Sequence, residues 1–206
     1  VESLESALDL GRAGAPPTHL VIGLAPGGGA LDTAALEVVE RAIEAGLSVH
    51  SGLHHLLGDD PRLAALAAEH GVEIVDARRP PGRSSLHAYS GKIAEVESAR
   101  VAVLGVDSGI GKRTTAWLLV DELLRAGRTA ELIGTGQTAW LQGAEFSVPL
   151  DALVYDFVPG ELEHVVWRAW RDRRPDFLVI EGQGGLLNPG YFGGHEILLA
   201  ARPSVG

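Results

Sequence analysis

The sequence of 206 residues predicts an α/β fold made of two units, each built on a mainly parallel sheet. Apolar runs of strand length alternate with stretches whose apolar residues recur at helical spacing, which is typical of parallel sheets. Residues 78–99 lose this periodicity and collect Pro, Gly, Ser and charged residues. We therefore predict an N-terminal domain at residues 1–80, a connection at 81–99 and a second domain at 100–206.

In the first domain, the elements have the order of a βαβαβ unit, whose parallel strands need helical crossovers. Capping residues delimit the two helices. Asp32 is placed to cap the first helix and Gly46 to end it; Asp60 and Pro61 begin the second, and Gly71 follows it. The predicted strands are residues 19–24, 47–52 and 72–77.

In the second domain, two amphipathic helices are predicted, one after Lys112 that stops at Gly127 and one that begins near Glu161. Three of the apolar runs around them end in small polar loops rich in glycine. The predicted strands are residues 101–104, 129–134, 151–157 and 176–182.

The composition restricts the classes of partner. Lys and Arg number 17 against 27 Asp and Glu, a net charge of −10 that opposes binding to nucleic acid or to an anionic membrane. No apolar run approaches the ~20 residues that span a bilayer. The absence of cysteine excludes thiolate metal sites within the sequence and fits a cytoplasmic protein. Since Val1 is not a natural start and methionine is absent, we expect missing segments at both ends.

The stretch from Arg100 to Ala116, RVAVLGVDSGIGKRTTA, carries the clearest chemistry. It has the order strand, glycine-rich loop and helix N-terminus, in which free backbone N–H groups and a lysine hold phosphate groups. The predicted cofactor-binding residues of this loop are Gly105, Asp107, Ser108, Gly109, Ile110, Gly111, Lys112, Arg113 and Thr114.

The loop departs from the standard G-x-x-x-x-G-K-[ST] motif in two ways. Gly105 lies one position further from Lys112 than the motif requires, a spacing that resembles the dethiobiotin synthetase branch of P-loop proteins. Arg113 occupies the position whose hydroxyl normally holds Mg²⁺, and Thr114 comes one residue late, about 100° further around a helix. Phosphate binding survives these changes, whereas metal-assisted cleavage of a γ-phosphate is less favoured.

The loops GTGQT (134–138) and EGQGG (181–185) follow two other predicted strands. Ligands of parallel sheets bind at the carboxyl ends of the strands, so we expect both loops to join the lysine loop at one crevice. Glu181 is either a functional acid or a solvated strand-end carboxylate, and Asp107 either acts on a ligand or caps its loop. His195 is either structural or catalytic. We expect no metal.

Taken together, the segments resemble a family first known as a domain of unknown function, with a Rossmann-like N-terminal half and a P-loop C-terminal half. The resemblance covers most of residues 18–191, and it implies a Rossmann-like unit followed by a P-loop NTPase-like domain. The matching segments are VIGLAPGGG, SGLHHLLGDDPRLAALA, VDARRPPG, GVDSGIGKRTTA, GTGQTAWLQG, YDFVPGELE and VIEGQGGLLNPGY.

Characterised relatives are similar to D-glutamate N-acetyltransferases that use acetyl-CoA, so the resemblance implies acetyl transfer to an amino acid amine. The lysine loop would then hold the phosphates of acetyl-CoA. Gln137 and Gln183 would line the acyl site, and Glu181 or Asp107 would be the base for the amine.

In most relatives we expect Ser-x-x-His-Pro after the EGQG motif. Here Gly185 and Asn188 replace the serine and the histidine, so a proton-transfer role is lost or moved, with His195 as the candidate.

Two other functions stay open. An ATP-dependent ligase or kinase of the dethiobiotin synthetase type would need Glu181 and Thr114 to hold Mg²⁺. A nucleotide-binding protein without turnover is compatible with the loss of the serine and the histidine. For the leading function, the expected partners are a small amino acid and further copies of the chain.

Overall fold

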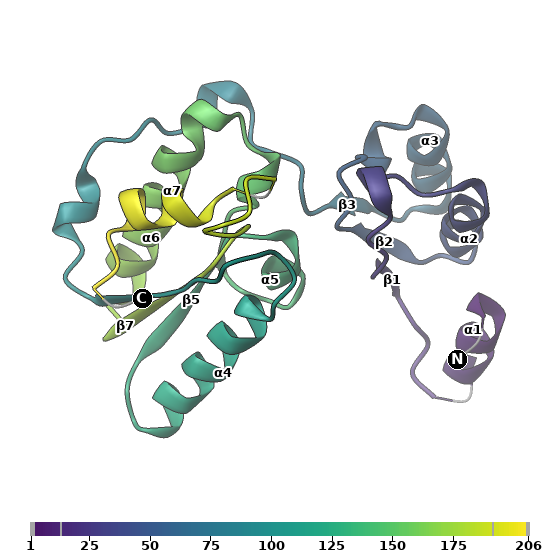
Figure 1. The fold of residues 1–206 in the computed structure, drawn as a ribbon. Helices are drawn as coiled ribbons and strands as arrows, with labels where there is room; N and C mark the ends of the chain where they lie inside the picture. The colour runs from purple at the N-terminus through teal and green to yellow at the C-terminus, as the bar shows by residue number, and fades with distance from the viewer. Residues whose placement is uncertain (1–2, 13, 191, 205–206) are drawn as a thin grey trace. The chain divides into compact units, whose positions relative to one another are not determined.

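The computed structural model describes residues 3–12, 14–190 and 192–204. The chain divides into two compact units, residues 1–79 and 80–206, each with its own sheet and hydrophobic core (Figure 1). Among the described residues, no helix combines the length and the apolar character that crossing a membrane requires.

The first unit is a three-stranded parallel sheet in the order β1-β2-β3, which confirms the predicted βαβαβ unit. Its elements are α1 (Leu4–Arg12), β1 (His19–Ile22), η1 (Gly27–Gly29), α2 (Thr33–Glu44), β2 (Ser48–Ser51), η2 (Leu57–Asp59), α3 (Pro61–His70) and β3 (Ile74–Asp76). Val49 on the central strand packs in one buried cluster with Ile43 from α2 and Leu63 from α3.

The predicted caps of both helices are confirmed. The Asp32 side chain accepts a hydrogen bond from the Ala35 N–H at 2.8 Å, and that of Asp60 accepts one from the Arg62 N–H at 2.8 Å. Gly71 ends α3 with φ of 66°, in the left-handed region that favours glycine. Local sequence therefore determines where these helices begin and end.

The second unit is a four-stranded parallel sheet in the order β4-β7-β5-β6. Its strands are β4 (Ala99–Val103), β5 (Ala130–Gly134), β6 (Phe146–Ser147) and β7 (Phe177–Glu181). Its α-helices are α4 (Lys112–Arg125), α5 (Gln137–Leu141), α6 (Val158–Arg173) and α7 (Gly194–Ala201). Short 3₁₀ turns are η3 (Arg83–Ser85), η4 (Lys92–Glu95), η5 (Leu150–Ala152) and η6 (Tyr155–Phe157).

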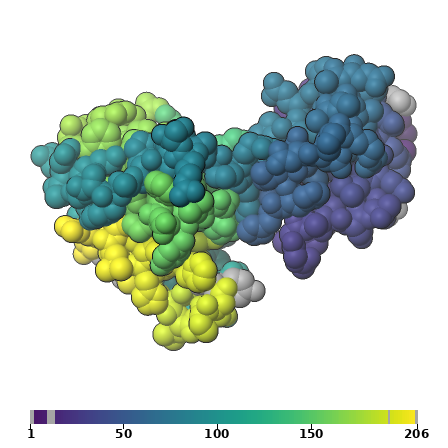
Figure 2. Space-filling model, turned by 90° about the horizontal axis from the view of Figure 1, so that it is seen from above, coloured from purple at the N-terminus to yellow at the C-terminus, as the bar shows by residue number. Residues whose placement is uncertain are grey.

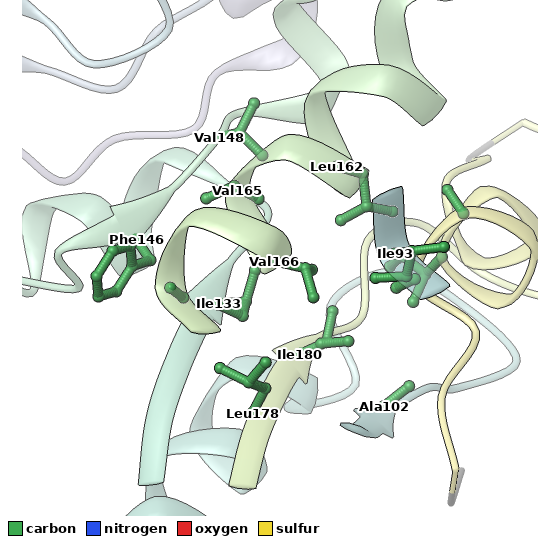
Figure 3. Packing of buried hydrophobic residues seen from close by; sticks show 14 of the residues in the cluster. Ile93, Ala102, Ile133, Phe146, Val148, Leu162, Val165, Val166, Leu178 and Ile180 are labelled. Atoms are coloured by element: carbon green, nitrogen blue, oxygen red, sulfur yellow. The ribbon is translucent and has the colours of Figure 1, made fainter. Parts of the chain in front are cut away.

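Alternation along the central strands separates two buried layers. Ile133 of β5 and Leu178 and Ile180 of β7 belong to the cluster that includes α6 and α7, which Figure 3 shows from close by. Their chain neighbours Leu132 and Val179 belong to the cluster of α4 and α5. Because successive strand residues point to opposite faces, helices cover the sheet on both sides.

Residues 80–99 lie within the second unit and pack on α6, on the surface that Figure 2 shows in teal beside green. The buried Glu163 accepts hydrogen bonds from the Ser90 N–H at 2.7 Å and the Ile93 N–H at 3.1 Å. A Cβ at Gly160 would lie 2.0 Å from the His87 carbonyl oxygen, so the close approach of this segment to α6 requires glycine. The segment is thus an integral part of the second unit.

One predicted strand is wrong. Residues 151–157 form the turns η5 and η6, and the edge of the sheet is instead the two-residue strand β6. The apolar side chains of Val154 and Tyr155 are 49% and 60% exposed, so this segment has no sheet to bury them. α6 begins at Val158, three residues before the predicted start, with Pro159 in its first turn.

Candidate functional site

Three loops meet at the carboxyl edge of the second sheet, as predicted. They follow β4, β7 and β5, which are neighbours in that order. The Leu186 N–H donates to the Gly105 carbonyl oxygen at 2.9 Å, which joins the loops after β7 and β4. The Thr135 hydroxyl donates to the Glu181 carbonyl oxygen at 2.9 Å, which joins β7 to the loop after β5.

Lys112 is the first residue of α4 and only 9% exposed. Its Nζ donates to the carbonyl oxygens of Asp107 and Gly184, both at 2.6 Å. Burial lowers the pKa of Lys112, and the charges of Asp107 and Glu181 oppose that shift. The cation therefore lies between two of the loops, and within the described residues no carboxylate forms an ion pair with it.

Close packing explains two glycines after β7. A Cβ at Gly182 would lie 2.2 Å from the Val103 carbonyl oxygen and 2.8 Å from the Lys112 Cδ. A Cβ at Gly185 would lie 2.7 Å from the Val106 carbonyl oxygen. A serine at Gly185 therefore does not fit this arrangement of the loops, which gives a physical reason for the glycine found there.

The lysine loop fits a phosphate group. Gly109 and Gly111 have φ of 69° and 94°, and a Cβ at either would meet nothing within 4 Å. The first N–H groups of α4 have no acceptor inside the helix and lie at its positive end. A buried cation, backbone N–H groups without a helical acceptor and an open glycine backbone are the features with which such loops hold phosphate, and phosphate binding by this loop stays a prediction.

Glu181, the last residue of β7, is 7% exposed. Its Oε2 accepts hydrogen bonds from the N–H groups of Thr135 at 2.9 Å and Gly136 at 3.2 Å. Burial raises the pKa of Glu181, although these bonds and the charges of Arg113 and Lys112 act in the opposite direction. The interpretation of Glu181 as a solvated strand-end carboxylate is therefore wrong.

Asp107 is held differently. Its Oδ1 accepts hydrogen bonds from the Asn188 side-chain amide at 2.8 Å and from the Ser108 N–H at 2.7 Å. These two bonds lower the pKa of Asp107. Asn188, which replaces the expected histidine, thus ties the lysine loop to the loop after β7.

The two glutamines lie on the loops that meet Glu181. An ideal Cβ at Gly136 would be 3.4 Å from the Gln183 Oε1 and 3.8 Å from the Glu181 Oε1. Gln183 and Glu181 therefore both reach the start of α5, whose first residue is Gln137.

His195 lies exposed in the first turn of α7. No hydrogen bond or ion pair joins its ring to any residue that the structure describes. The neighbouring Glu196 accepts a hydrogen bond from the Tyr155 hydroxyl at 2.9 Å. None of the described residues thus orients the His195 ring by a hydrogen bond or ion pair, and its catalytic role stays a prediction.

The donor set does not fit the Mg²⁺ site of P-loop NTPases. The position after Lys112 carries the Arg113 guanidinium in place of a hydroxyl, and its positive charge acts on Glu181. Thr114 is exposed on the helix, and Oε2 of Glu181 already accepts two N–H groups. Among the described residues there is no group of three or more His, Asp or Glu side chains placed to hold a metal.

Two further residues at this edge, Thr135 and Asn188, have structural roles that no motif in the sequence indicates. Thr135 is fully buried and fixes β7 through its hydroxyl. Asn188 is noted in the sequence only as a departure from the resembled family. The role of Thr135 could have been suspected from the sequence, because its hydroxyl lies between two glycines at a strand end. The bond between Asn188 and Asp107 could not, because the two residues are 81 positions apart.

Comparisons with known proteins agree with this architecture. Residues 1–80 match the Rossmann-like domain, and residues 87–205 the P-loop domain, of the domain-of-unknown-function family DUF1611. A protein of this family from Anabaena variabilis has a crystal structure with a TM-score of 0.87 and 35% identity. The match covers 100% of this chain and 57% of that one.

Two relatives are named D-glutamate N-acetyltransferase. The one from Tritonibacter scottomollicae is 34% identical over 92% of this chain and 54% of its own length. The one from a Pseudoalteromonas species is 30% identical over 84% of this chain and 50% of its own length. The chain thus spans about half the length of these relatives. With both domain models matched in order, the chain belongs to the DUF1611 family, as a Rossmann-like unit followed by a P-loop domain.

Proposed function

We propose that this chain provides the cofactor site and the catalytic base of an N-acetyltransferase that moves an acetyl group from acetyl-CoA to the amine of a D-glutamate-like amino acid. The names of the two relatives support the reaction class. The observation that carries the proposal is Glu181, a buried carboxylate of raised pKa beside a phosphate-binding loop with no Mg²⁺ ligand after its lysine.

Glu181 is the better of the two candidate bases. A general base works best when its pKa approaches the working pH, and burial moves the pKa of Glu181 upward. The hydrogen bonds from Asn188 and Ser108 move the pKa of Asp107 downward, away from the working pH. Asp107 therefore stabilises the lysine loop, and Glu181 is the base that accepts the proton of the amine.

Each residue of the site has a separate role in the proposed reaction. Bound acetyl-CoA supplies an acetyl group activated as a thioester. Lys112 and the N–H groups at the start of α4 bind its phosphates. As the C–N bond forms and the C–S bond breaks, Glu181 accepts the surplus proton of the amine, and the sulfur leaves with the CoA. Gln183 and Gln137 donate hydrogen bonds to the thioester oxygen as negative charge develops.

The test is a turnover assay with the full chain, acetyl-CoA and D-glutamate, followed by mass spectrometry of the acetylated amino acid and by release of free CoA. We expect product with wild type and at least ~100-fold less with Glu181→Gln, because general bases contribute about 10²- to 10⁴-fold. A thermal-shift assay runs beside it. Stabilisation by ATP only with Mg²⁺, and none by CoA, would contradict the proposal and favour the ATP-dependent ligase.

A further inference from the structure

A cleft of about 460 Å³ runs along the flank of α4, starting at the residue after Lys112. Since a helix rises 1.5 Å per residue, the stretch of α4 that lines it is roughly 12 Å long. Its lining combines one cation, one carboxylate, an indole, a hydroxyl, an amide and one aliphatic side chain: Arg113, Asp121, Trp117, Thr114, Gln142 and Leu118.

Arg113 connects this cleft to the phosphate site. Its charge acts on the pKa of Glu181, so the guanidinium lies near the carboxyl edge of the sheet as well as in the cleft. Its Nε is buried and has no hydrogen-bond partner among the described residues. The side chain is half-buried and lines the cleft, so its guanidinium places a positive charge there that favours an anionic group of a ligand.

Trp117 forms a fixed aromatic wall. Its Nε1 donates to the side-chain oxygen of Gln142, another lining residue, at 3.1 Å, and the side chain packs in part against the buried cluster under α4. The orientation of the indole is therefore set before any ligand arrives. Beyond it, the exposed Asp121 carboxylate offers an acceptor for amino groups.

We propose that this cleft binds the adenosine part of the cofactor whose phosphates bind at Lys112. The base stacks on Trp117, its amino group donates to Asp121, and Arg113 contacts the phosphate nearest the ribose. This inference rests on the proposed function only for the identity of the cofactor, because CoA and ATP share adenosine. An acidic acceptor such as glutamate does not suit the cleft, since Asp121 repels it and Arg113 is the single cation among the described residues that line the cleft.

The test measures binding of acetyl-CoA, ATP and inorganic pyrophosphate by calorimetry to wild type, Trp117→Ala, Trp117→Phe and Leu124→Ala. Leu124 is the control, an exposed residue of α4 outside the cleft. Trp117→Ala is expected to weaken whichever adenosine ligand binds by about tenfold, the usual size of base stacking on an aromatic ring. Trp117→Phe keeps most of the affinity, and pyrophosphate binds all variants within about twofold.

Two results would overturn the inference: unchanged adenosine-ligand affinity in Trp117→Ala, or an equal loss for pyrophosphate. The arms also separate it from the proposed function. If ATP binds in a Trp117-dependent way and acetyl-CoA does not bind, the proposed acetyltransferase function is contradicted and the adenosine site is supported. If acetyl-CoA binds equally well without Trp117, the adenosine site is contradicted and the proposed acetyltransferase function stands.

Discussion

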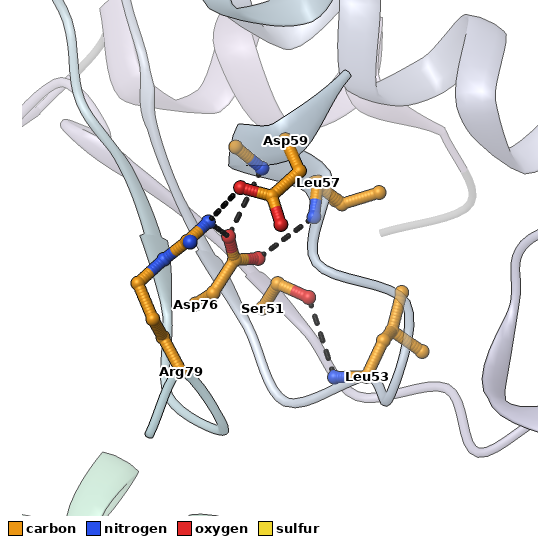
Figure 4. Close-up of polar contacts among 7 residues, drawn as sticks. Ser51, Leu53, Leu57, Asp59, Asp76 and Arg79 are labelled. Atoms are coloured by element: carbon orange, nitrogen blue, oxygen red, sulfur yellow. Dashed lines mark hydrogen bonds and ion pairs between the residues drawn. The ribbon is translucent and has the colours of Figure 1, made fainter. Parts of the chain in front are cut away.

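Each unit of the molecule ends a parallel strand in a buried carboxylate, Asp76 in the first and Glu181 in the second. Both accept hydrogen bonds from two consecutive backbone N–H groups. Asp76 binds those of η2 at 2.9 and 3.0 Å (Figure 4), and Glu181 binds those of Thr135 and Gly136 at 2.9 and 3.2 Å. In their hydrogen bonds from the backbone alone, the two carboxylates are nearly the same.

The charges around them differ. Asp76 is bound directly by Arg79 at 3.1 Å, and Arg79 is shared with Asp59 at 2.8 Å, so this carboxylate is neutralised within a structural network. The charges of Arg113 and Lys112 lower the pKa of Glu181, but neither forms an ion pair with it among the described residues. Burial has the larger effect and raises its pKa. We infer that the charges around a strand-end carboxylate decide whether it serves the structure, as Asp76 does, or can act as a base, as proposed for Glu181.

The largest effect is expected for Glu181→Gln. Turnover should fall at least ~100-fold while the affinity for acetyl-CoA stays within about threefold, because the base is lost and the phosphate loop is kept. Steady-state kinetics and calorimetry measure the two quantities. Asp107→Asn is the matched control, with a loss below about tenfold. Equal losses in the two variants would remove the distinction between these acids.

Asp76→Ala should act on stability alone. Removing the acceptor of two N–H groups is expected to lower the free energy of unfolding by about 2 kcal/mol, with acetyl-CoA affinity unchanged. Urea denaturation followed by circular dichroism measures the loss. Asp59→Ala, which removes the exposed partner of the same arginine, should cost under ~0.5 kcal/mol. Weaker cofactor binding by Asp76→Ala would contradict the purely structural role of Asp76 and would indicate that the sheet edge of the first unit also takes part in function.

Gly185→Ser restores the residue expected in relatives and tests the close contact of the loops. The new Cβ would meet the Val106 carbonyl oxygen at 2.7 Å and the Asp107 Cα at 2.8 Å, so the lysine loop must shift. We expect acetyl-CoA to bind roughly fivefold more weakly, in line with a cost of about 1 kcal/mol for overpacking. Gly82→Ser, whose Cβ would meet only the Ser85 Oγ at 4.0 Å, should leave the affinity unchanged.

The smallest effect concerns pH and the segment that packs on α6. Burial, aided by the charges of Lys92 and His87, lowers the pKa of His164 from 6.5 to about 4. Between pH 6.5 and 4 the unfolded chain binds a proton at this site that the folded chain does not, so stability falls as the pH falls. His164→Gln should reduce the loss of Tm across this window by a few degrees. An identical pH dependence in the variant would contradict the assignment.

Sequence alone predicted much of the fold because many of its signals are local. Asp60, Pro61 and Gly71 delimit a helix by their own backbone preferences, and the lysine loop is contiguous in the chain. Residues 151–157 were mispredicted because their apolar residues match a strand pattern, while tertiary pairing gives the edge of the sheet to Phe146 and Ser147.

The candidate site also combines features that local sequence predicts with features that depend on distant residues. The convergence of the three loops followed from the parallel order of the strands. The burial of Glu181, the bond from Asn188 to Asp107 and the orphan Nε of Arg113 depend on groups far apart in the sequence. No pattern in the sequence contains them, so the choice between the two acids required the structure.

Binding of the cofactor's phosphates at the start of α4 is the basis of the proposed function. Calorimetric titration of acetyl-CoA into wild type, Lys112→Ala and Arg125→Ala tests it, with the exposed Arg125 at the other end of the same helix as the control. We expect affinity at least ~tenfold weaker for Lys112→Ala and unchanged for Arg125→Ala, since of these two residues Lys112 alone adds its charge to the N–H groups of the loop. Equal affinity of Lys112→Ala and wild type would contradict it.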